Sequence, residues 1–243
     1  MIKYIKSEML KTKKSKLFLY SILIPFICGL FSVFFGGTFN ALQQSIYWWT
    51  SFFLPINLEV LVFLDLKLDE EANRYFNINI LKSDMNKVLF AKILVVIIYG
   101  VISNLFMTLL VCLFKWSMPS NGLSYEYFYI INGMQLLFLT QVWVIPLTYY
   151  LLNKMNGMFL ISISGIIFFI VAPFLSATKY YFCILTSFSY KVMKYIFMIK
   201  ESGDILNKVT KISSTMFYSS IIISFLLFII LLEIVLRRNI RYD

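Results

Sequence analysis

The chain has 243 residues, of which 60% are hydrophobic and 14% charged, and it carries a net charge of +10. Soluble domains hold about 45–50% apolar and about 25% charged residues, so a water-soluble fold could not bury this much apolar surface. The chain has no histidine and no glycine followed by lysine, which excludes His-based catalysis, His-ligated zinc and a P-loop.

The basic residues flank apolar runs and form no basic face, so they indicate membrane topology rather than nucleic-acid binding. Cys28, Cys112 and Cys183 share no close spacing, and two of them lie in apolar runs. They therefore predict neither a disulfide framework nor a metal motif. We expect no metal, no cofactor and no nucleic-acid partner.

The first 16 residues predict an amphipathic helix that lies on the membrane. Within 2–10, lysines occupy one side and apolar residues recur at i, i+3, i+7 and i+8 on the other, namely Ile2, Ile5, Met9 and Leu10. The apolar run that follows does not read as a cleavable signal, because Pro25 interrupts it and 36–38 is a poor cleavage site.

Six segments contain the ~20 apolar residues that a helix needs to cross the hydrocarbon core. The predicted fold class is an all-α membrane protein, with six transmembrane helices and an N-terminal interfacial amphipathic helix in a single domain, 1–243. The predicted spans are 17–35, 47–66, 88–114, 128–152, 157–175 and 216–236.

The short loops predict the orientation of these spans. Lysines and arginines gather before the first span, in 67–92 and after the last span, whereas the loops 36–46 and 115–127 hold only Lys115. The positive-inside rule therefore predicts that both termini lie on the cytoplasmic side of the membrane. The loop 176–215 is predicted outside despite its six lysines, because the rule governs long loops weakly.

Glu59 is the most informative polar residue of the second span. It follows Pro55, which should bend the helix and free a carbonyl, and a carboxylate inside a membrane must face protein or water. Two readings stay open: Glu59 lines a translocation path, or it reaches a basic partner such as Lys92. Asp65 lies nearer the membrane boundary, where we expect it to be solvated.

Polar residues in other spans predict contacts between helices. Asn104, Gln135 and Gln141 should hydrogen-bond to neighbouring helices. With Pro146 on the same span, Gln135 and Gln141 form a second candidate for lining a translocation path.

Aromatic residues mark two outer segments. The Tyr-Trp-Trp run at 47–49 is typical of an anchor at headgroup depth. The loop 176–215 mixes lysines with aromatic rings, which predicts that it dips into the outer interface. Our hypothesis is that Tyr190, Lys191 and Lys194 contact lipid headgroups or gate the release of an amphipathic substrate.

The chain resembles the ABC-2 type permease family and, more narrowly, the lantibiotic-immunity permeases, the E-type subunits of nisin-, epidermin- and mutacin-like self-protection exporters. The resemblance runs over nearly the whole chain. The stretches that carry it are Ser7-Glu8 with Lys11, Lys13-Lys14-Ser15, Ser45-Ile46-Tyr47-Trp48-Trp49, Asp65-Leu66-Lys67 with Glu70-Glu71, Val171-Ala172-Pro173-Phe174 and Lys200-Glu201-Ser202-Gly203-Asp204.

The resemblance implies a location in a bacterial cell membrane, and with no nucleotide-binding motif in the sequence we expect that the chain is not itself an enzyme. It implies a separate ABC ATPase, a second permease subunit or a homodimer, and export of a cationic amphipathic peptide from the membrane. It also implies that the loop 67–87 is a coupling helix, with Asp69, Glu70, Glu71 and Arg74 against the ATPase. Two alternatives remain: an ABC-2 exporter for another drug or lipid, and a membrane sensor or scaffold that transports nothing.

Overall fold

The structure is a computed structural model, and it describes residues 1–12, 15–71, 85–117, 125–152, 154–176, 178, 187–206 and 214–237. Within these ranges the regular elements are helical, apart from one isolated bridge between Ile199 and Ile205. In chain order they are α1 (Ile2–Thr12), α2 (Leu17–Trp48), η1 (Trp49–Phe53), α3 (Leu54–Glu71), α5 (Met85–Ser117), α6 (Tyr127–Leu139), α7 (Val144–Leu152), α8 (Gly157–Ile166), η2 (Ile167–Val171), α9 (Ala172–Ser176), α10 (Ser187–Phe197) and α11 (Ser214–Arg237).

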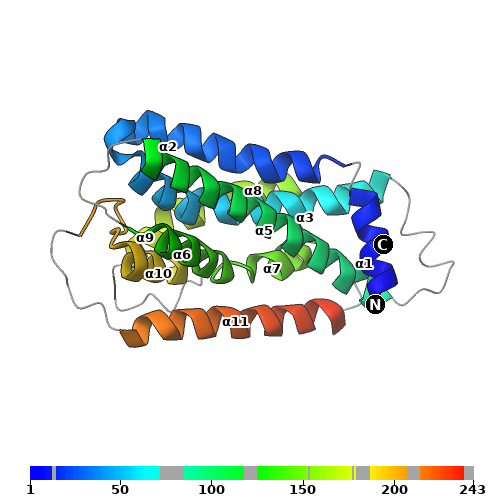
Figure 1. The fold of residues 1–243 in the computed structure, drawn as a ribbon. Helices are drawn as coiled ribbons and strands as arrows, with labels where there is room; N and C mark the ends of the chain where they lie inside the picture. The colour runs from blue at the N-terminus through cyan, green and yellow to red at the C-terminus, as the bar shows by residue number, and fades with distance from the viewer. Residues whose placement is uncertain are drawn as a thin grey trace.

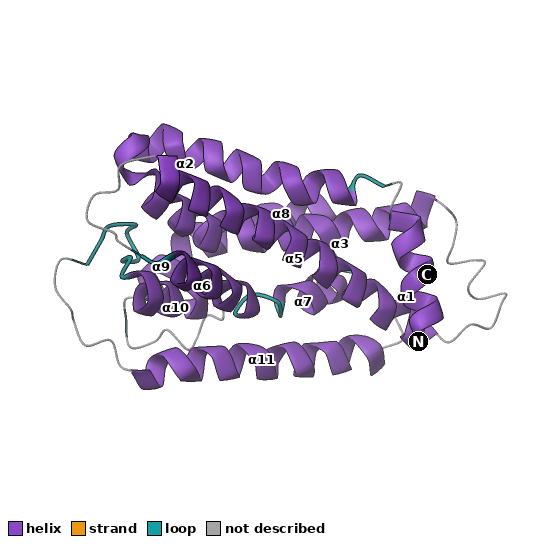
Figure 2. Cartoon of the chain, viewed as in Figure 1, coloured by secondary structure: helices purple, strands orange, loops and turns teal. Residues whose placement is uncertain are grey.

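Five helical stretches are long and apolar enough to cross a membrane: Leu17–Glu71, Asn86–Ser117, Tyr127–Leu152, Gly157–Ser176 and Ser214–Arg237. They pack as an elongated bundle, with α1 and the end of α11 at one end and α10 at the other (Figure 1). Coloured by secondary structure, the described chain is helix with short connections (Figure 2). This is the architecture of a membrane-embedded helical protein.

The longest stretch folds back on itself at Gly37. Gly37 has φ 63° and ψ −179°, a conformation that side chains rarely allow, and it interrupts an otherwise helical α2. The rings of Phe31 and Phe53 consequently lie 5.8 Å apart, although 22 residues of unbroken helix would separate them by about 33 Å. The predicted loop 36–46 is therefore wrong in extent, because a single glycine makes the turn.

The predicted helix 128–152 is broken between α6 and α7. Pro146 has no N–H to offer the Val142 carbonyl, which accepts instead from the N–H of Ile145 at 3.1 Å, so a turn replaces the helix. Two other stretches stay continuous but contain a π-helical turn, at η1 and at η2. Such turns widen a helix by one residue and often mark functional positions.

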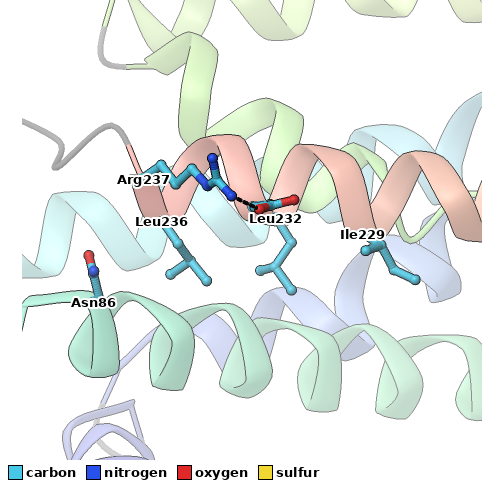
Figure 3. Close-up of a pocket in the computed structure, with 6 residues that line it drawn as sticks. Asn86, Ile229, Leu232, Leu236 and Arg237 are labelled. Atoms are coloured by element: carbon cyan, nitrogen blue, oxygen red, sulfur yellow. Dashed lines mark hydrogen bonds and ion pairs between the residues drawn. The ribbon is translucent and has the colours of Figure 1, made fainter.

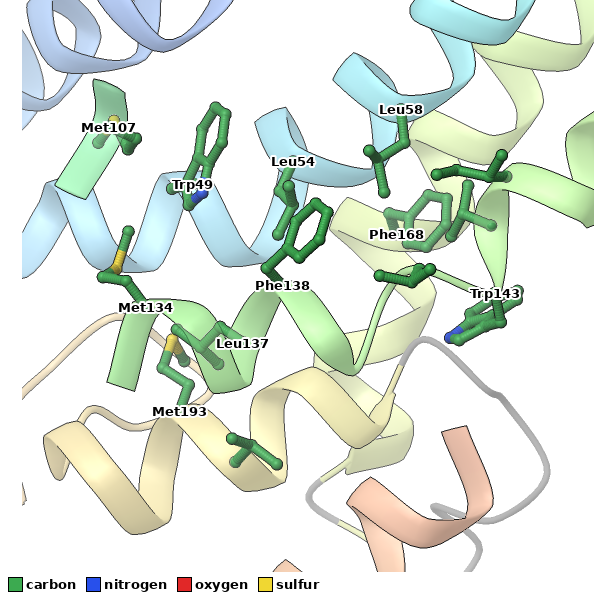
Figure 4. Close-up of a cluster of buried hydrophobic side chains, with 14 of the residues drawn as sticks. Trp49, Leu54, Leu58, Met107, Met134, Leu137, Phe138, Trp143, Phe168 and Met193 are labelled. Carbon is green, nitrogen blue, oxygen red and sulfur yellow. The ribbon is translucent and has the colours of Figure 1, made fainter. Parts of the chain in front are cut away.

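The buried core runs along the middle of the bundle and includes α10. Side chains from η1, α3, α5, α6, η2, α10 and the turn at 140–143 pack together there, with Trp49, Phe138, Trp143, Phe168 and Met193 among them (Figure 4). The segment 176–215 is therefore not a simple outer loop. It contains α10, which packs against α6, α9 and α11 at one end of the bundle.

The helix α1 is shorter than predicted, and its polar edge faces the protein. Glu8 and Thr12 are buried, whereas Ile2, Met9 and Leu10 are exposed. The apolar face is therefore left for the surroundings of the bundle.

Candidate functional site

A cluster of charged side chains joins α1 to the bundle. Lys11 on α1 lies 2.6 Å from a carboxylate oxygen of Glu8, 2.5 Å from Asp69 and 3.9 Å from Asp65. Lys92 on α5 forms a second ion pair with Asp69. We call these five residues the charge cluster: their side chains are at most 12% exposed, although they come from three helices.

Neighbouring hydroxyl groups extend the charge cluster into α7 and add a second contact between α5 and α1. Tyr149 donates a hydrogen bond to Asp65 at 2.8 Å, and Tyr99 donates to Thr12 of α1 at 3.1 Å. The expectation that Asp65 is solvated is therefore wrong, because Asp65 faces the α1–α5 contact and is fully buried. Removing one member of such a buried set would leave another charge without compensation.

The four residues predicted to contact the ATPase differ in their exposure to solvent. The helix α3 continues through Asp69, Glu70 and Glu71, where the sequence predicts a loop. Asp69 is buried in the charge cluster, so its side chain is not available to a partner protein. Glu70 and Glu71 are exposed, Glu71 lying 4.0 Å from Lys67, and Arg74 lies outside the described residues.

Gln141 connects two irregular helices near the middle of the bundle. In an α-helix, the N–H of residue 54 would serve the Thr50 carbonyl, but here Leu54 donates to Trp49. Residue 55 is proline and has no N–H, so the Thr50 carbonyl is left over. The Gln141 side-chain amide donates to it at 2.7 Å, which confirms that Pro55 frees a carbonyl.

Further polar side chains surround this connection. Asn104 accepts from the Trp49 indole at 3.0 Å and donates to the Met134 carbonyl at 3.2 Å. Trp49 is also fully buried, so its predicted role as a headgroup anchor is wrong. Asn57 donates to Ser103 at 2.8 Å, between α3 and α5.

Interhelical bonds are thus confirmed for Asn104 and Gln141, but not for Gln135. The buried amide nitrogen of Gln135 has no hydrogen-bond partner among the described residues. Both glutamines lie on the same predicted span, yet among the described residues only the side-chain amide of Gln141 donates to a main-chain carbonyl.

Glu59 has a different partner from the one predicted. Its carboxylate accepts a hydrogen bond from Ser164 of α8 at 2.5 Å, whereas Lys92 pairs with Asp69. The prediction of a Glu59–Lys92 contact is therefore wrong. Glu59 is only 4% exposed, on the side of α3 that faces α8.

The three residues predicted to contact substrate or lipid near 190 are largely enclosed. Tyr190 is buried and donates to the Phe168 carbonyl at 3.1 Å, and burial raises the pKa of its phenol. Lys194 lies 3.1 Å from Glu201, and partial burial lowers the pKa of Lys191, against the opposing effect of Glu201. This segment is packed into the bundle rather than extended over its surface.

Side chains that donate to main-chain carbonyls hold this end of the bundle. Tyr125 and Tyr129 donate to the carbonyls of Phe197 and Ile196 at the C-terminus of α10. Gln43 donates to the Gly203 carbonyl in the turn that follows. Helix C-termini leave carbonyls without intrahelical partners, so the two tyrosines act as caps.

A groove lies between the end of α11 and the start of α5 (Figure 3). Its lining is apolar except for Asn86, Glu233 and Arg237, and the last two form an ion pair with each other. None of the predicted site residues lines it. Within the described ranges, no group of acidic, cysteine or histidine residues could hold a metal ion.

The pairing of Lys11 with Asp69 is the feature of the candidate site that the sequence analysis did not predict. The two residues are 58 positions apart, and each lies in a stretch already singled out, one for its basic charge and the other for its acidic charge. A basic residue on an amphipathic helix is ordinarily solvated, so only its location on the buried edge of α1 would have indicated the pair.

No family model, no curated protein and no solved structure matches the chain.

Proposed function

We propose that the chain is the membrane-spanning permease subunit of an ABC exporter that removes a lantibiotic-type peptide from the membrane. In this proposal the bundle crosses the membrane six times, because the stretch Leu17–Glu71 turns at Gly37 and contributes two crossings. Both termini then lie at the cytoplasmic end, together with α1. Energy comes from a separate ABC ATPase.

The charge cluster is the observation that carries this proposal. An ATPase outside the membrane can move membrane helices only through a stiff contact at their ends. The ion pairs between α1, α3 and α5 make such an end, because they fix three helices to one another through buried charges. Glu70 and Glu71 are exposed immediately beyond the cluster, where a partner could contact them.

The location of polar groups also supports transport of an amphipathic molecule rather than an ion. The interior hydrogen bonds of Asn57, Asn104 and Gln141 are made to other protein groups. A continuous hydrophilic pore is unnecessary for a substrate that already resides in the membrane. A lateral path along the helices would suffice.

The proposal is tested by deleting the gene for this chain from the bacterium that encodes it. The sensitivity of the cells to nisin- and epidermin-type peptides is then measured. We expect greater sensitivity to at least one peptide, and co-purification of an ABC ATPase with the tagged chain. Glu70→Lys should abolish co-purification, because it reverses an exposed charge beside the cluster. The matched control is Glu126→Lys, an exposed glutamate at the α10 end of the bundle.

Unchanged sensitivity to every peptide, with an ATPase still bound, would favour an exporter of another drug or lipid. Absence of any ATPase would favour a sensor or scaffold. Equal ATPase recovery with Glu70→Lys and Glu126→Lys would refute the assignment of the coupling surface.

A further inference from the structure

Glu59 has an environment unlike that of the other buried carboxylates. Glu8, Asp65 and Asp69 each have an ammonium group within 4.0 Å. Among the described residues, no lysine or arginine comes within that distance of Glu59, whose partner is the neutral hydroxyl of Ser164. A carboxylate inside hydrocarbon is costly unless a cation or several donors compensate it.

The surroundings of Glu59 form a seam between α3 and α8. Phe52 at the end of η1 and Ile56, Glu59 and Phe63 of α3 follow one another at helical spacing, so they share the face of this continuous helix that meets α8. A Cβ atom on Gly165 would lie 3.4 Å from Ile56 and 3.6 Å from Phe52, and one on Gly157 would lie 2.4 Å from Phe63. The two helices therefore approach closely above and below the carboxylate.

Only one helix separates the seam from the surroundings of the bundle. The outer face of the segment 157–171 exposes large apolar side chains, including Met158, Phe159, Ile166 and Ile170. In a membrane these side chains contact acyl chains. For a molecule dissolved in the bilayer, the segment 157–171 is therefore the only barrier to Glu59 on this side among the described residues.

Aromatic rings lie along the same seam. Phe169 in η2 stacks on Trp48 with ring centroids 5.2 Å apart and meets Phe52 edge-on at 5.8 Å. Phe52 is seven residues from Glu59, about 10 Å along the helix. Both flanking helices contain a π-helical turn here, η1 and η2, so this part of the seam is the least regular. Aromatic faces bind apolar groups and attract cations.

We propose that the seam binds the cationic group of an amphipathic molecule arriving from the membrane. The cation pairs with the Glu59 carboxylate in place of the Ser164 hydroxyl, and its apolar body lies against Phe52 and Phe169. The inference rests on the proposed function and deepens it, since it assigns recognition of the positive charge of the substrate to Glu59. Binding itself requires no ATPase.

The test compares two probes of the same shape and opposite charge, tetraphenylphosphonium and tetraphenylborate. The purified chain in nanodiscs of zwitterionic lipid is equilibrated with each probe, and bound probe is measured by dialysis. We expect saturable binding of the phosphonium that Glu59→Gln weakens about tenfold, as for the loss of one charged contact. Binding of the borate should not weaken in Glu59→Gln, because the substitution removes a negative charge that would repel an anion.

Glu126→Gln is the matched control, since it makes the same change at an exposed glutamate at the far end of the bundle and should alter neither affinity. Ser164→Ala removes the internal partner of Glu59 and keeps the carboxylate, so phosphonium binding should be at least as tight as in the wild type. This variant also decides the matter if Glu59→Gln does not fold.

Equal phosphonium affinities of the wild type and Glu59→Gln would overturn the proposal, and so would weaker binding by Ser164→Ala. Neither result would bear on ATPase recovery, which tests the proposed function separately. Conversely, a chain that binds the phosphonium through Glu59 but recovers no ATPase would retain the site and lose the exporter assignment.

Discussion

The two ends of the bundle are held together by different chemistry. At the α1 end, Lys11, Asp69 and Lys92 connect three helices through buried ion pairs between side chains. At the α10 end, Tyr125 and Gln43 donate to main-chain carbonyls. Ion pairs depend on both partners keeping their charge, whereas a carbonyl acceptor is always present. The α1 end should therefore be the more sensitive to single substitutions.

The largest expected effect is at the α1 end. Asp69→Ala leaves the ammonium groups of Lys11 and Lys92 buried without their carboxylate, so we expect a loss of about 3–5 kcal/mol in unfolding free energy. Thermal or denaturant unfolding in detergent measures it. Glu71→Ala is the control, since it removes an exposed pair with Lys67 worth at most about 1 kcal/mol. Equal losses in the two variants would show that the cluster does not stabilise this end.

An intermediate effect is expected at Gln141 in the middle of the bundle. Its side chain donates to a main-chain carbonyl, as Tyr125 and Gln43 do at the α10 end. Gln141→Leu leaves the Thr50 carbonyl unserved, at a cost of about 1–3 kcal/mol in unfolding free energy. Gln135→Leu is the same substitution on the same stretch, and it removes an amide nitrogen that lacks a partner in the described chain. It should cost nothing or stabilise. The opposite order would contradict the assignment of Gln141 as the connection.

The smallest effect is expected at the α10 end. Tyr125→Phe removes one of the two hydroxyl caps of α10, so we expect a local loss of about 0.5–1.5 kcal/mol. Hydrogen exchange of the main-chain amides in 190–199 should become faster, without a change elsewhere. Tyr218→Phe, at an exposed tyrosine of α11, is the control. A change confined to α11, or the same change in both variants, would contradict the capping role.

The helices themselves follow closely from composition. The predicted spans 88–114, 157–175 and 216–236 lie within the helical stretches Asn86–Ser117, Gly157–Ser176 and Ser214–Arg237. Pro55 was correctly expected to free a carbonyl, because a missing N–H is a property of the residue alone. The break at 140–143 was not predicted, although Pro146 was noted on this span. The local sequence does not distinguish a proline that bends a helix from one that ends it.

The partners of the polar residues did not follow from sequence. Lys92 was expected near Glu59 and instead meets Asp69, while Glu59 meets Ser164. Glu59 and Asp69 are ten residues apart on one helix, so their side chains point about 80° apart and lie about 15 Å apart along the helix axis. Direction and depth along the bundle both separate them, and the sequence does not fix which neighbouring helix lies at each position.

The sequence by itself determined a helical protein for a membrane, because runs of about 20 apolar residues are stable only where hydrocarbon surrounds them and backbone groups bond internally. It also determined that chemistry based on histidine is absent. Only the tertiary structure decided that Lys11 pairs with Asp69, 58 residues away, and that Gln141 serves Thr50, 91 residues away. The physical reason is that hydrophobic burial sets which segments are helical, whereas the packing of helix faces sets which polar groups meet.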